Sequence, residues 1–233
     1  MKITTLLFDV GDTLFNLTEY RSTALNIVIE KLVDQGILIG NVENSKSLFE
    51  ELVTKISDLH SDRFFLTIDF FKELFEKMKL KVDVKLCHYA FLIYRDTLRF
   101  LLKPSTDINR LFFDLKEKGY KLGIITDGSL DSAYEILLRL GIVNFFDTIV
   151  VSEEVGVEKP DTKIFHEALR RLKSEPTETI MIGDNLERDI HGGKQLGMVT
   201  VLMQRYKLQE ESETSIKPDY KIRRLDELFK ILN

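Results

Sequence analysis

The sequence is poor in the features that mark secreted, membrane-spanning or nucleic-acid-binding proteins. Its 233 residues include a single cysteine, Cys87, and no tryptophan, so no disulfide can form within the chain. The apolar runs are far shorter than the roughly 18 residues that a membrane span needs. The formal net charge is -5, with no long basic block. The composition therefore gives little reason to expect nucleic acid or a membrane as a partner.

The chain does contain enough apolar material to build a substantial core. Hydrophobic residues make up 44% of the sequence, which is consistent with one large domain or with a domain that carries an insertion. The first residues run directly into a strand-like segment, so we expect no signal peptide and a cytoplasmic location. Cys87 stands in an apolar helical stretch, where the expected role is that of a small buried core residue.

Five short apolar runs, rich in β-branched residues, are spaced along the chain. They cover residues 4–9, 121–126, 147–152, 179–184 and 199–203. The runs are too short for helices and too apolar for half-exposed strands, which indicates strands buried on both faces of a parallel sheet. Segments with helical periodicity follow three of them, at 130–141, 161–173 and 187–197, and a short sixth strand is expected near 219–222. This alternation predicts an α/β fold with a doubly wound, Rossmann-like parallel sheet.

More than a hundred residues separate the first two runs, whereas a plain crossover needs only about 10 to 12. Most of this stretch has helical periodicity, in the segments 19–36, 45–59, 68–80 and 84–102. Each segment has an apolar face to bury. We therefore expect an α-helical subdomain over residues 16–103, inserted into a core formed by residues 1–15 and 104–233. Because ligands bind at the carboxyl ends of such strands, this subdomain is expected to form a lid.

Carboxylates gather where two of the predicted strands end. Asp9 follows the first strand, Asp184 follows the fourth, and Asp189 comes about one helical turn later. Carboxylates this close repel one another unless a cation is present, and a small group of oxygens is what Mg²⁺ accepts. The alternative is that Asp184 is a turn residue and Asp189 a charge at a helix N-terminus.

A second group of polar residues suits an anion. Thr126, Asp127 and Gly128 place a hydroxyl and backbone N–H groups at a strand-to-helix turn, where anions bind well. Lys159 precedes a proline that restricts the backbone at the entrance to the next helix. Taken singly, these features are also consistent with a simple helix cap and a solvated lysine.

Taken together, these elements resemble the haloacid dehalogenase-like (HAD) hydrolase superfamily over nearly the whole chain. The family's first motif corresponds to Asp9-Val10-Gly11-Asp12-Thr13-Leu14, and its second to the strand that ends in Thr126. Its third motif corresponds to Lys159-Pro160, and its fourth to Gly183-Asp184 with Asp189. The insertion after the first motif resembles the α-helical type of cap found in this superfamily.

The resemblance implies a Mg²⁺-dependent phosphatase that acts on a small phosphorylated metabolite. Asp9 would be the nucleophile and would form an aspartyl-phosphate. The other implied roles are phosphate binding by Thr126, Asp127, Gly128 and Lys159, and magnesium binding by Asp9, Asp184 and the backbone carbonyl of Gly11. Asp189 would be a further metal ligand or would hold Lys159 in place. A monomer and a homodimer both remain open.

The sequence departs from the family at Gly11. In its phosphatases this position usually carries a second aspartate, which protonates the leaving oxygen and later activates water. Asp12 occupies the next position and is either a loop residue or a displaced general acid, because a one-residue shift normally turns a side chain another way. Three functions therefore stay open: a phosphatase, a dehalogenase-type or phosphonate-cleaving hydrolase, and a non-catalytic protein that binds phosphate or a metabolite.

Overall fold

The structure is a computed structural model that describes residues 2–37, 47, 51, 67–80, 82–204 and 216–232. The chain divides into two compact units, one formed by Met1–Asn16 with Lys103–Asn233 and the other by Leu17–Leu102. These boundaries lie one residue from the expected ones, while the expected roles of the two units as core and lid stay a prediction. The helix predicted at 45–59 lies outside the described residues.

The first unit is built on a six-stranded parallel sheet, which confirms the predicted fold class. The strands are β1 (Thr5–Phe8), β2 (Lys121–Thr126), β3 (Thr148–Val151), β4 (Thr179–Gly183), β5 (Val199–Met203) and β6 (Tyr220–Ile222), in the order β3-β2-β1-β4-β5-β6. Strand β1 lies between β2 and β4, with Phe8 opposite Ile124 and Ile182. The residues that follow these three strands therefore meet at one edge of the sheet.

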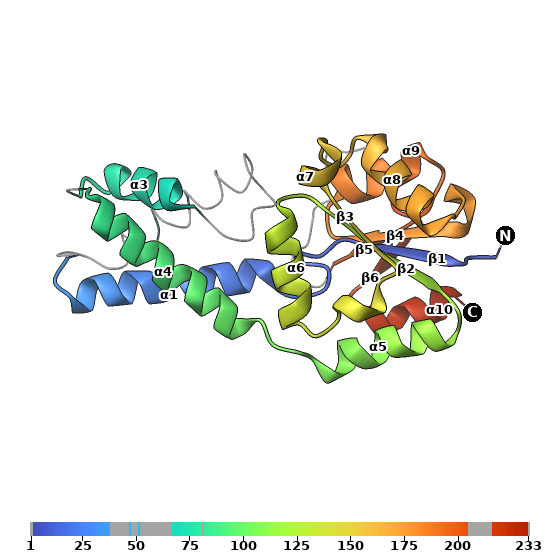
Figure 1. Ribbon diagram of the computed structural model, residues 1–233, viewed down its shortest axis with the longest axis horizontal. Helices are drawn as coiled ribbons and strands as arrows, with labels where there is room; N and C mark the ends of the chain where they lie inside the picture. Colours follow the sequence, from blue (N-terminus) through green and yellow to red (C-terminus); the bar gives the residue numbers. More distant parts are fainter. Residues whose placement is uncertain are drawn as a thin grey trace. The chain divides into compact units, whose positions relative to one another are not determined.

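Helices cover both faces of this sheet. They are α5 (Thr106–Glu117), α6 (Leu130–Arg139), α7 (Ser152–Val155), α8 (Thr162–Leu172), α9 (Gly192–Gln195) and α10 (Leu228–Leu232), with α8 and α9 on one side and α5 and α10 on the other (Figure 1). Neighbouring side chains of β1 point to opposite faces. Leu7 belongs to the same cluster as Phe165 of α8, whereas the ring of Phe8 lies 5.3 Å from that of Phe112 in α5. Burial on both faces explains why β1 is apolar from Leu6 to Phe8.

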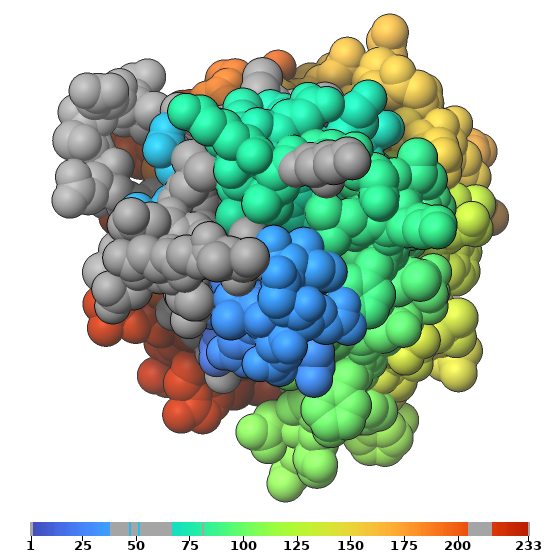
Figure 2. All heavy atoms as spheres, turned by 90° about the vertical axis from the view of Figure 1, so that its left-hand side faces the viewer, coloured from blue at the N-terminus to red at the C-terminus, as the bar shows by residue number. Residues whose placement is uncertain are grey.

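The second unit contains α1 (Leu17–Asp34), α3 (Ile68–Lys77) and α4 (Val84–Leu101) among its described residues. Helix α1 packs along α4, and α3 packs on α4 as well; Figure 2 shows the blue atoms of α1 bordering the green atoms of α4. The buried residues of α1 recur at helical spacing, as in Leu25, Val28, Ile29 and Leu32. Among the described helices, none combines the length and the apolar character needed to cross a membrane.

Candidate active site

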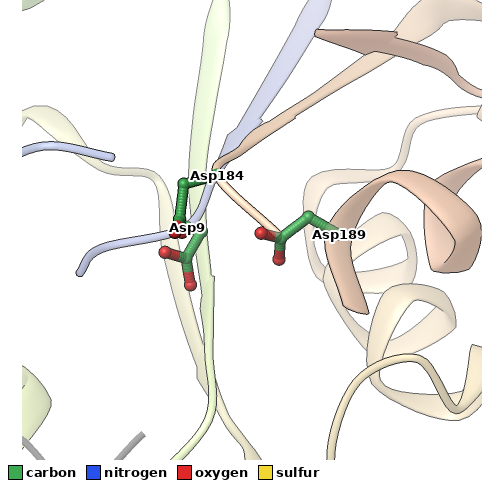
Figure 3. Close-up of side chains that lie close together, drawn as sticks. All are labelled: Asp9, Asp184 and Asp189. Carbon is green, nitrogen blue, oxygen red and sulfur yellow. The ribbon is translucent and has the colours of Figure 1, made fainter. Parts of the chain in front are cut away.

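Three aspartates from two distant parts of the chain meet at the carboxyl edge of the sheet. Asp9 follows β1, Asp184 follows β4, and Asp189 lies in the turn after β4. Carboxylate oxygens of all three lie within 4.8 Å of one another, and Figure 3 shows the three carboxyl groups close together. The parallel register of β1 and β4 produces this proximity, because Phe8 and Ile182 are opposite each other one and two residues before the aspartates.

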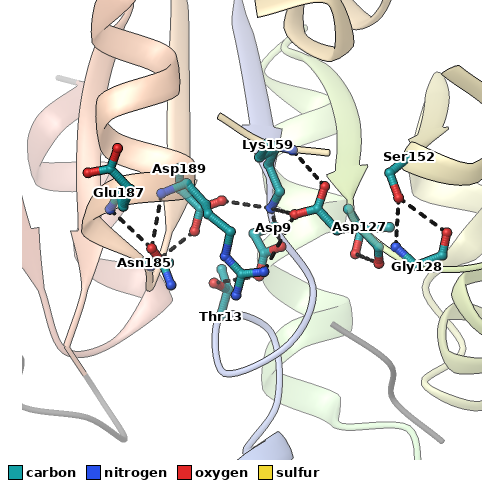
Figure 4. A network of polar contacts seen from close by, with 11 residues as sticks. Asp9, Thr13, Asp127, Gly128, Ser152, Lys159, Asn185, Glu187 and Asp189 are labelled. Atoms are coloured by element: carbon teal, nitrogen blue, oxygen red, sulfur yellow. Dashed lines mark hydrogen bonds and ion pairs between the residues drawn. The ribbon is translucent and has the colours of Figure 1, made fainter. Parts of the chain in front are cut away.

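Lys159 supplies a buried positive charge between two of these aspartates. Its Nζ donates to Asp9 Oδ1 at 2.6 Å and to Asp189 Oδ1 at 2.7 Å (Figure 4). The lysine side chain is only 3% exposed, although it comes from the loop between α7 and α8. A lysine buried to this degree needs charged partners, and the sequence placed all three residues in one candidate site.

Asp127 fixes the loop that carries Lys159. Its Oδ1 accepts a hydrogen bond from the Lys159 backbone N–H at 2.8 Å. Its Oδ2 is buried without a hydrogen-bond partner, but it lies 3.8 Å from both Lys159 Nζ and Arg188 Nη1. The phosphate-binding role expected for Asp127 stays a prediction, and its carboxyl group contacts the two cations of the site.

The carboxylate of Asp189 is held at both oxygens. Oδ1 accepts from Lys159, and Oδ2 accepts from the Asn185 backbone N–H at 3.0 Å. The side chain is fully buried. A Cβ added to Gly183 would collide with it, so the glycine of the fourth motif leaves the space that Asp189 occupies. The contact with Lys159 is consistent with the expected role of holding that lysine in place, and the alternative role as a metal ligand stays a prediction.

The turn after β4 differs from the expected single helix at 187–197. Residues Leu186–His191 form a π-helical turn, and α9 follows. The carbonyl of Asn185 accepts hydrogen bonds from the N–H groups of both Asp189 and Ile190, which widens the turn. The Asn185 side chain also caps the turn through the N–H groups of Glu187 and Arg188. Neither Asn185 nor Arg188 was singled out from the sequence, because a cap and a charged helix residue are common outside active sites.

The predicted anion cradle after β2 is partly engaged in internal bonds. Thr126 is buried at the end of the strand, with its hydroxyl 3.4 Å from the Asp127 carbonyl. The Gly128 N–H donates to Ser152 Oγ at 2.8 Å. Because this N–H already has a partner, the phosphate-binding role expected for Gly128 stays a prediction. The left-handed backbone of Gly128, at φ 111°, is the conformation that favours glycine there.

The first motif forms a tight turn after Asp9. The Thr13 hydroxyl donates to Asp9 Oδ2 at 3.3 Å, and the Leu14 N–H donates to the Val10 carbonyl. Asp12 is buried and has a left-handed backbone with φ 52°, a conformation that aspartate tolerates better than most residues. Gly11 lies outside the left-handed region, so its backbone conformation does not require glycine.

The electrostatics of the site favour an added cation. Four carboxylates (Asp9, Asp127, Asp184 and Asp189) gather around two cationic side chains, Lys159 and Arg188. Burial raises the pKa of Asp9 to about 6 although Lys159 opposes the shift, and burial also raises the pKa of Asp127. Burial disfavours the charged form of Lys159, but Asp189, Asp9 and Asp127 outweigh it and hold its pKa well above the usual value.

The donor set fits a magnesium ion. The cluster has two carboxylates more than it has cationic side chains, which matches the charge of one divalent ion, and Mg²⁺ prefers oxygen ligands. Both oxygens of Asp189 already accept hydrogen bonds from Lys159 and Asn185. Both oxygens of Asp9 also accept hydrogen bonds, from Lys159 and Thr13, so these bonds do not separate the candidates. Asp9, Asp184 and Asp189, whose carboxylate oxygens lie within 4.8 Å of one another, are the residues that could hold the ion.

Comparison with known proteins identifies the family. A family model described as haloacid dehalogenase-like hydrolase matches residues 6–203. The chain belongs to the haloacid dehalogenase-like hydrolases. This membership confirms the resemblance that the four motifs predicted.

Relatives of this hydrolase from two archaea are named glyceraldehyde 3-phosphate phosphatase. The Methanopyrus kandleri protein is 36% identical, over 99% of this chain and 97% of its own. The Methanocaldococcus jannaschii protein is 34% identical, over 97% and 96%. Among solved structures, the magnesium-bound putative HAD-hydrolase YfnB from Bacillus subtilis is 28% identical, with a TM-score of 0.75 and 100% of each chain covered. A HAD phosphatase from Thermococcus onnurineus is 26% identical, with a TM-score of 0.67, covering 100% of this chain and 98% of its own.

Proposed function

We propose that the protein is a Mg²⁺-dependent phosphatase that hydrolyses a small phosphomonoester through an aspartyl-phosphate on Asp9. The observation that carries this proposal is the buried Lys159, whose Nζ lies 2.6 Å from Asp9 Oδ1 at the carboxyl edge of the sheet. A carboxylate that attacks a dianionic phosphate needs such positive charge beside it, because repulsion at about 4 Å amounts to several kcal/mol at an intermediate dielectric.

In the first step, an Asp9 carboxylate oxygen forms a bond to phosphorus and the bond to the ester oxygen breaks. The ester oxygen leaves with the bonding electrons and takes a proton from water or from an acid of the site, which completes the alcohol. In the second step, a water oxygen attacks the same phosphorus, which releases inorganic phosphate and restores the carboxylate. Thr13 and Lys159 each hold one oxygen of Asp9, which fixes the orientation of the nucleophile. Asp189 and Asp127 act through Lys159, by holding its ammonium group and its backbone.

Magnesium would be held by Asp9, Asp184 and the backbone carbonyl of Gly11. When bound, it would neutralise charge on the phosphoryl oxygens and orient the phosphate. Lys159 and the Thr126 hydroxyl would bind the phosphoryl group from the protein side. We assign Asp189 the role of positioning Lys159, because it is fully buried and accepts a hydrogen bond from Lys159 Nζ at 2.7 Å.

Gly11 lowers the expected rate without removing the site. It supplies no carboxyl group to protonate the leaving oxygen, and general acid catalysis is commonly worth about 10²- to 10⁴-fold. We therefore expect faster turnover with phosphate esters whose leaving group needs no proton. Asp12 is the nearest residue in sequence that could act as the acid.

The relatives narrow the substrate to test first. Two proteins with 36% and 34% identity over nearly the full chain are named glyceraldehyde 3-phosphate phosphatase. We propose three-carbon sugar phosphates, glyceraldehyde 3-phosphate first, as the substrate class. The unit Leu17–Leu102 would act as the cap and read the part of the substrate beyond its phosphate.

The test is a phosphatase assay with p-nitrophenyl phosphate and glyceraldehyde 3-phosphate, in Mg²⁺ and in chelator. We expect release of phosphate only with Mg²⁺, and its loss in Asp9→Asn. The matched control is Asp114→Asn, an aspartate that is 43% exposed on α5, which should keep full activity. Activity that persists in chelator or in Asp9→Asn would refute the proposal.

Gly11 also motivates the alternative of a non-catalytic phosphate-binding protein. Binding of phosphate and Mg²⁺ without turnover of either ester, or of a panel of sugar phosphates, would favour this alternative.

A further inference from the structure

Arg188 brings a second cation to the edge of the sheet where Asp9 lies. It belongs to the turn after β4, and its Nη1 lies 3.8 Å from Asp127 Oδ2, which follows β2. Because β1 lies between β2 and β4 in the sheet, the arginine side chain reaches across the end of β1. Asp9 stands at that end, so the guanidinium is close to the proposed nucleophile.

Arg188 is held in this place by the fold. Its backbone N–H donates to Asn185 Oδ1 at 3.0 Å, as part of the cap of the π-helical turn. Its side chain is 20% exposed, far less than that of a typical solvated arginine. Little conformational entropy would then be lost when the guanidinium binds a ligand.

The contact with Asp127 is an ion pair rather than a hydrogen bond. Asp127 Oδ2 is buried with no hydrogen-bond partner, and it lies 3.8 Å from both Arg188 Nη1 and Lys159 Nζ. A guanidinium carries five N–H donors in a planar fork, a geometry that matches the oxygens of a phosphate. The Asp127 carboxylate therefore holds the side chains of Lys159 and Arg188 close together. Both cations then lie next to the position that the phosphoryl group must occupy to react with Asp9.

We propose that Arg188 is a further substrate-binding residue, whose guanidinium binds phosphoryl oxygens of the substrate, with Asp127 as the residue that positions it. This role rests on the proposed phosphatase function, because the ligand is the phosphoryl group of the ester. Arginine pairs with phosphate through two parallel N–H···O bonds. In this arrangement Lys159 mainly holds the carboxylate of Asp9, and Arg188 binds the phosphoryl group of the substrate.

The experiment measures the affinity for inorganic phosphate by calorimetry in the presence of Mg²⁺. The proteins compared are the wild type, Arg188→Gln, Arg188→Lys and the control Arg170→Gln. Arg170 lies on α8, is 71% exposed and pairs with Glu167. We expect the phosphate Kd to rise about tenfold or more in Arg188→Gln, since a hydrogen bond to a charged group is lost. In Arg188→Lys the phosphate Kd should rise about threefold, because lysine keeps the charge but lacks the planar set of N–H donors. The control should have the Kd of the wild type.

Each result has a defined meaning. An unchanged Kd in Arg188→Gln overturns the proposal, and so does a lower Tm without a change in Kd, since that reports a purely structural ion pair with Asp127. If Arg188→Gln does not fold, Arg188→Lys decides, and a wild-type Kd in that variant overturns the bidentate contact.

Hydrolysis is measured separately, so the two proposals can fail independently. Phosphate binding that depends on Arg188 in a protein with no turnover rejects the phosphatase function alone. Turnover with an unchanged Kd in Arg188→Gln rejects only the role of Arg188. No phosphate binding by the wild type rejects the role of Arg188, and if the wild type also hydrolyses neither ester, both proposals are rejected.

Discussion

Gly183 lies against Asp189 so closely that a side chain on the first would displace the second. A Cβ on Gly183 would stand 2.5 Å from Asp189 Cβ, and closer still to the carboxyl group. Asp189 is the residue that anchors Lys159 Nζ at 2.7 Å. The absence of a side chain at Gly183 thus determines where the ammonium group beside Asp9 lies.

Gly183→Ala should therefore act on catalysis through Lys159. The methyl group would push Asp189 aside and shift the lysine, and a displacement of about 1 Å can cost about 100-fold in rate. We expect kcat to fall by about that factor, with a loss of about 1–3 kcal/mol in the free energy of unfolding from overpacking. Steady-state kinetics and urea unfolding provide the two measurements.

The matched control is Gly119→Ala, in the turn after α5. Gly119 has a φ of 82°, and a Cβ there would meet nothing within 4 Å. Its left-handed backbone should cost about 1–2 kcal/mol in stability without changing kcat. Full activity in Gly183→Ala would show that Lys159 does not depend on Asp189.

Asp9 should make the metal-free protein less stable as the pH rises. Burial raises its pKa from 3.8 to about 6, so the folded state binds a proton more tightly than the unfolded state does. A carboxyl group with a raised pKa lowers the free energy of unfolding above pH 6, and this decrease disappears as the pH falls toward 4. We expect Asp9→Asn to be more stable than the wild type at pH 8 in chelator, by on the order of 1–3 kcal/mol.

The comparison of urea unfolding at pH 8 and pH 4.5 tests this expectation. The difference between the two proteins should shrink at pH 4.5, because the wild-type carboxyl is then largely protonated in the folded state. Acids elsewhere with a lowered pKa, such as Glu167 beside Arg170, contribute equally to both proteins and cancel. A wild type that is the more stable protein at pH 8 contradicts the assignment.

The sequence predicted the parallel sheet and the residues of the site that stand at strand ends. Asp9, Thr126 and Asp184 follow short apolar runs, and runs of this kind have few alternatives to buried parallel strands. Asp189 was noted one helical turn after Asp184 and Lys159 before a proline, and the four motifs together then assigned both residues to the site. The structure adds the distances that join them, such as the 2.6 Å from Lys159 Nζ to Asp9 Oδ1.

The rest depended on tertiary geometry that leaves no local pattern. In the sequence, Arg188 has the pattern of an ordinary charged residue on a helix surface. In the structure, the turn after β4 places its Nη1 3.8 Å from Asp127 Oδ2. The Gly128 N–H seemed available to a phosphate because its partner, Ser152, lies 24 residues away in sequence. A π-helical turn has nearly the same composition as an α-helix, so the change at Leu186–His191 could not be read from periodicity.

Magnesium should stabilise the folded protein through Asp184. A ligand that binds only the folded state adds about 2.7 kcal/mol when present at about 100 times its Kd. We expect Mg²⁺ to raise the Tm of the wild type, and Asp184→Asn to lose most of that rise because a carboxylate ligand is removed. Asp114→Asn, exposed on α5, serves as the control and should keep the full shift. An unchanged shift in Asp184→Asn would place the ion elsewhere.

Gly11 and Asp12 can be separated by a pair of variants that respect the backbone of the turn. Asn tolerates the left-handed conformation found at Asp12, whose φ is 52°, so Asp12→Asn removes the acid with little strain. If Asp12 is the general acid, this variant should lose about 10²-fold or more in kcat on a poor leaving group and much less on p-nitrophenyl phosphate. Asp12→Asn with unchanged kcat on both esters would rule Asp12 out.

Gly11→Asp provides the complementary change, since the Gly11 backbone is not left-handed. With an inactive Asp12, the new carboxyl group should raise kcat on glyceraldehyde 3-phosphate more than on p-nitrophenyl phosphate, because only the poorer leaving group needs the proton.

Rapid-quench kinetics adds a second readout. A wild type that lacks an efficient base for water attack should release p-nitrophenol in a burst and then turn over slowly, and Gly11→Asp should abolish that burst by speeding hydrolysis of the aspartyl-phosphate. A wild type without a burst, whose turnover Gly11→Asp leaves unchanged on both esters, would mean that proton transfer does not limit this enzyme.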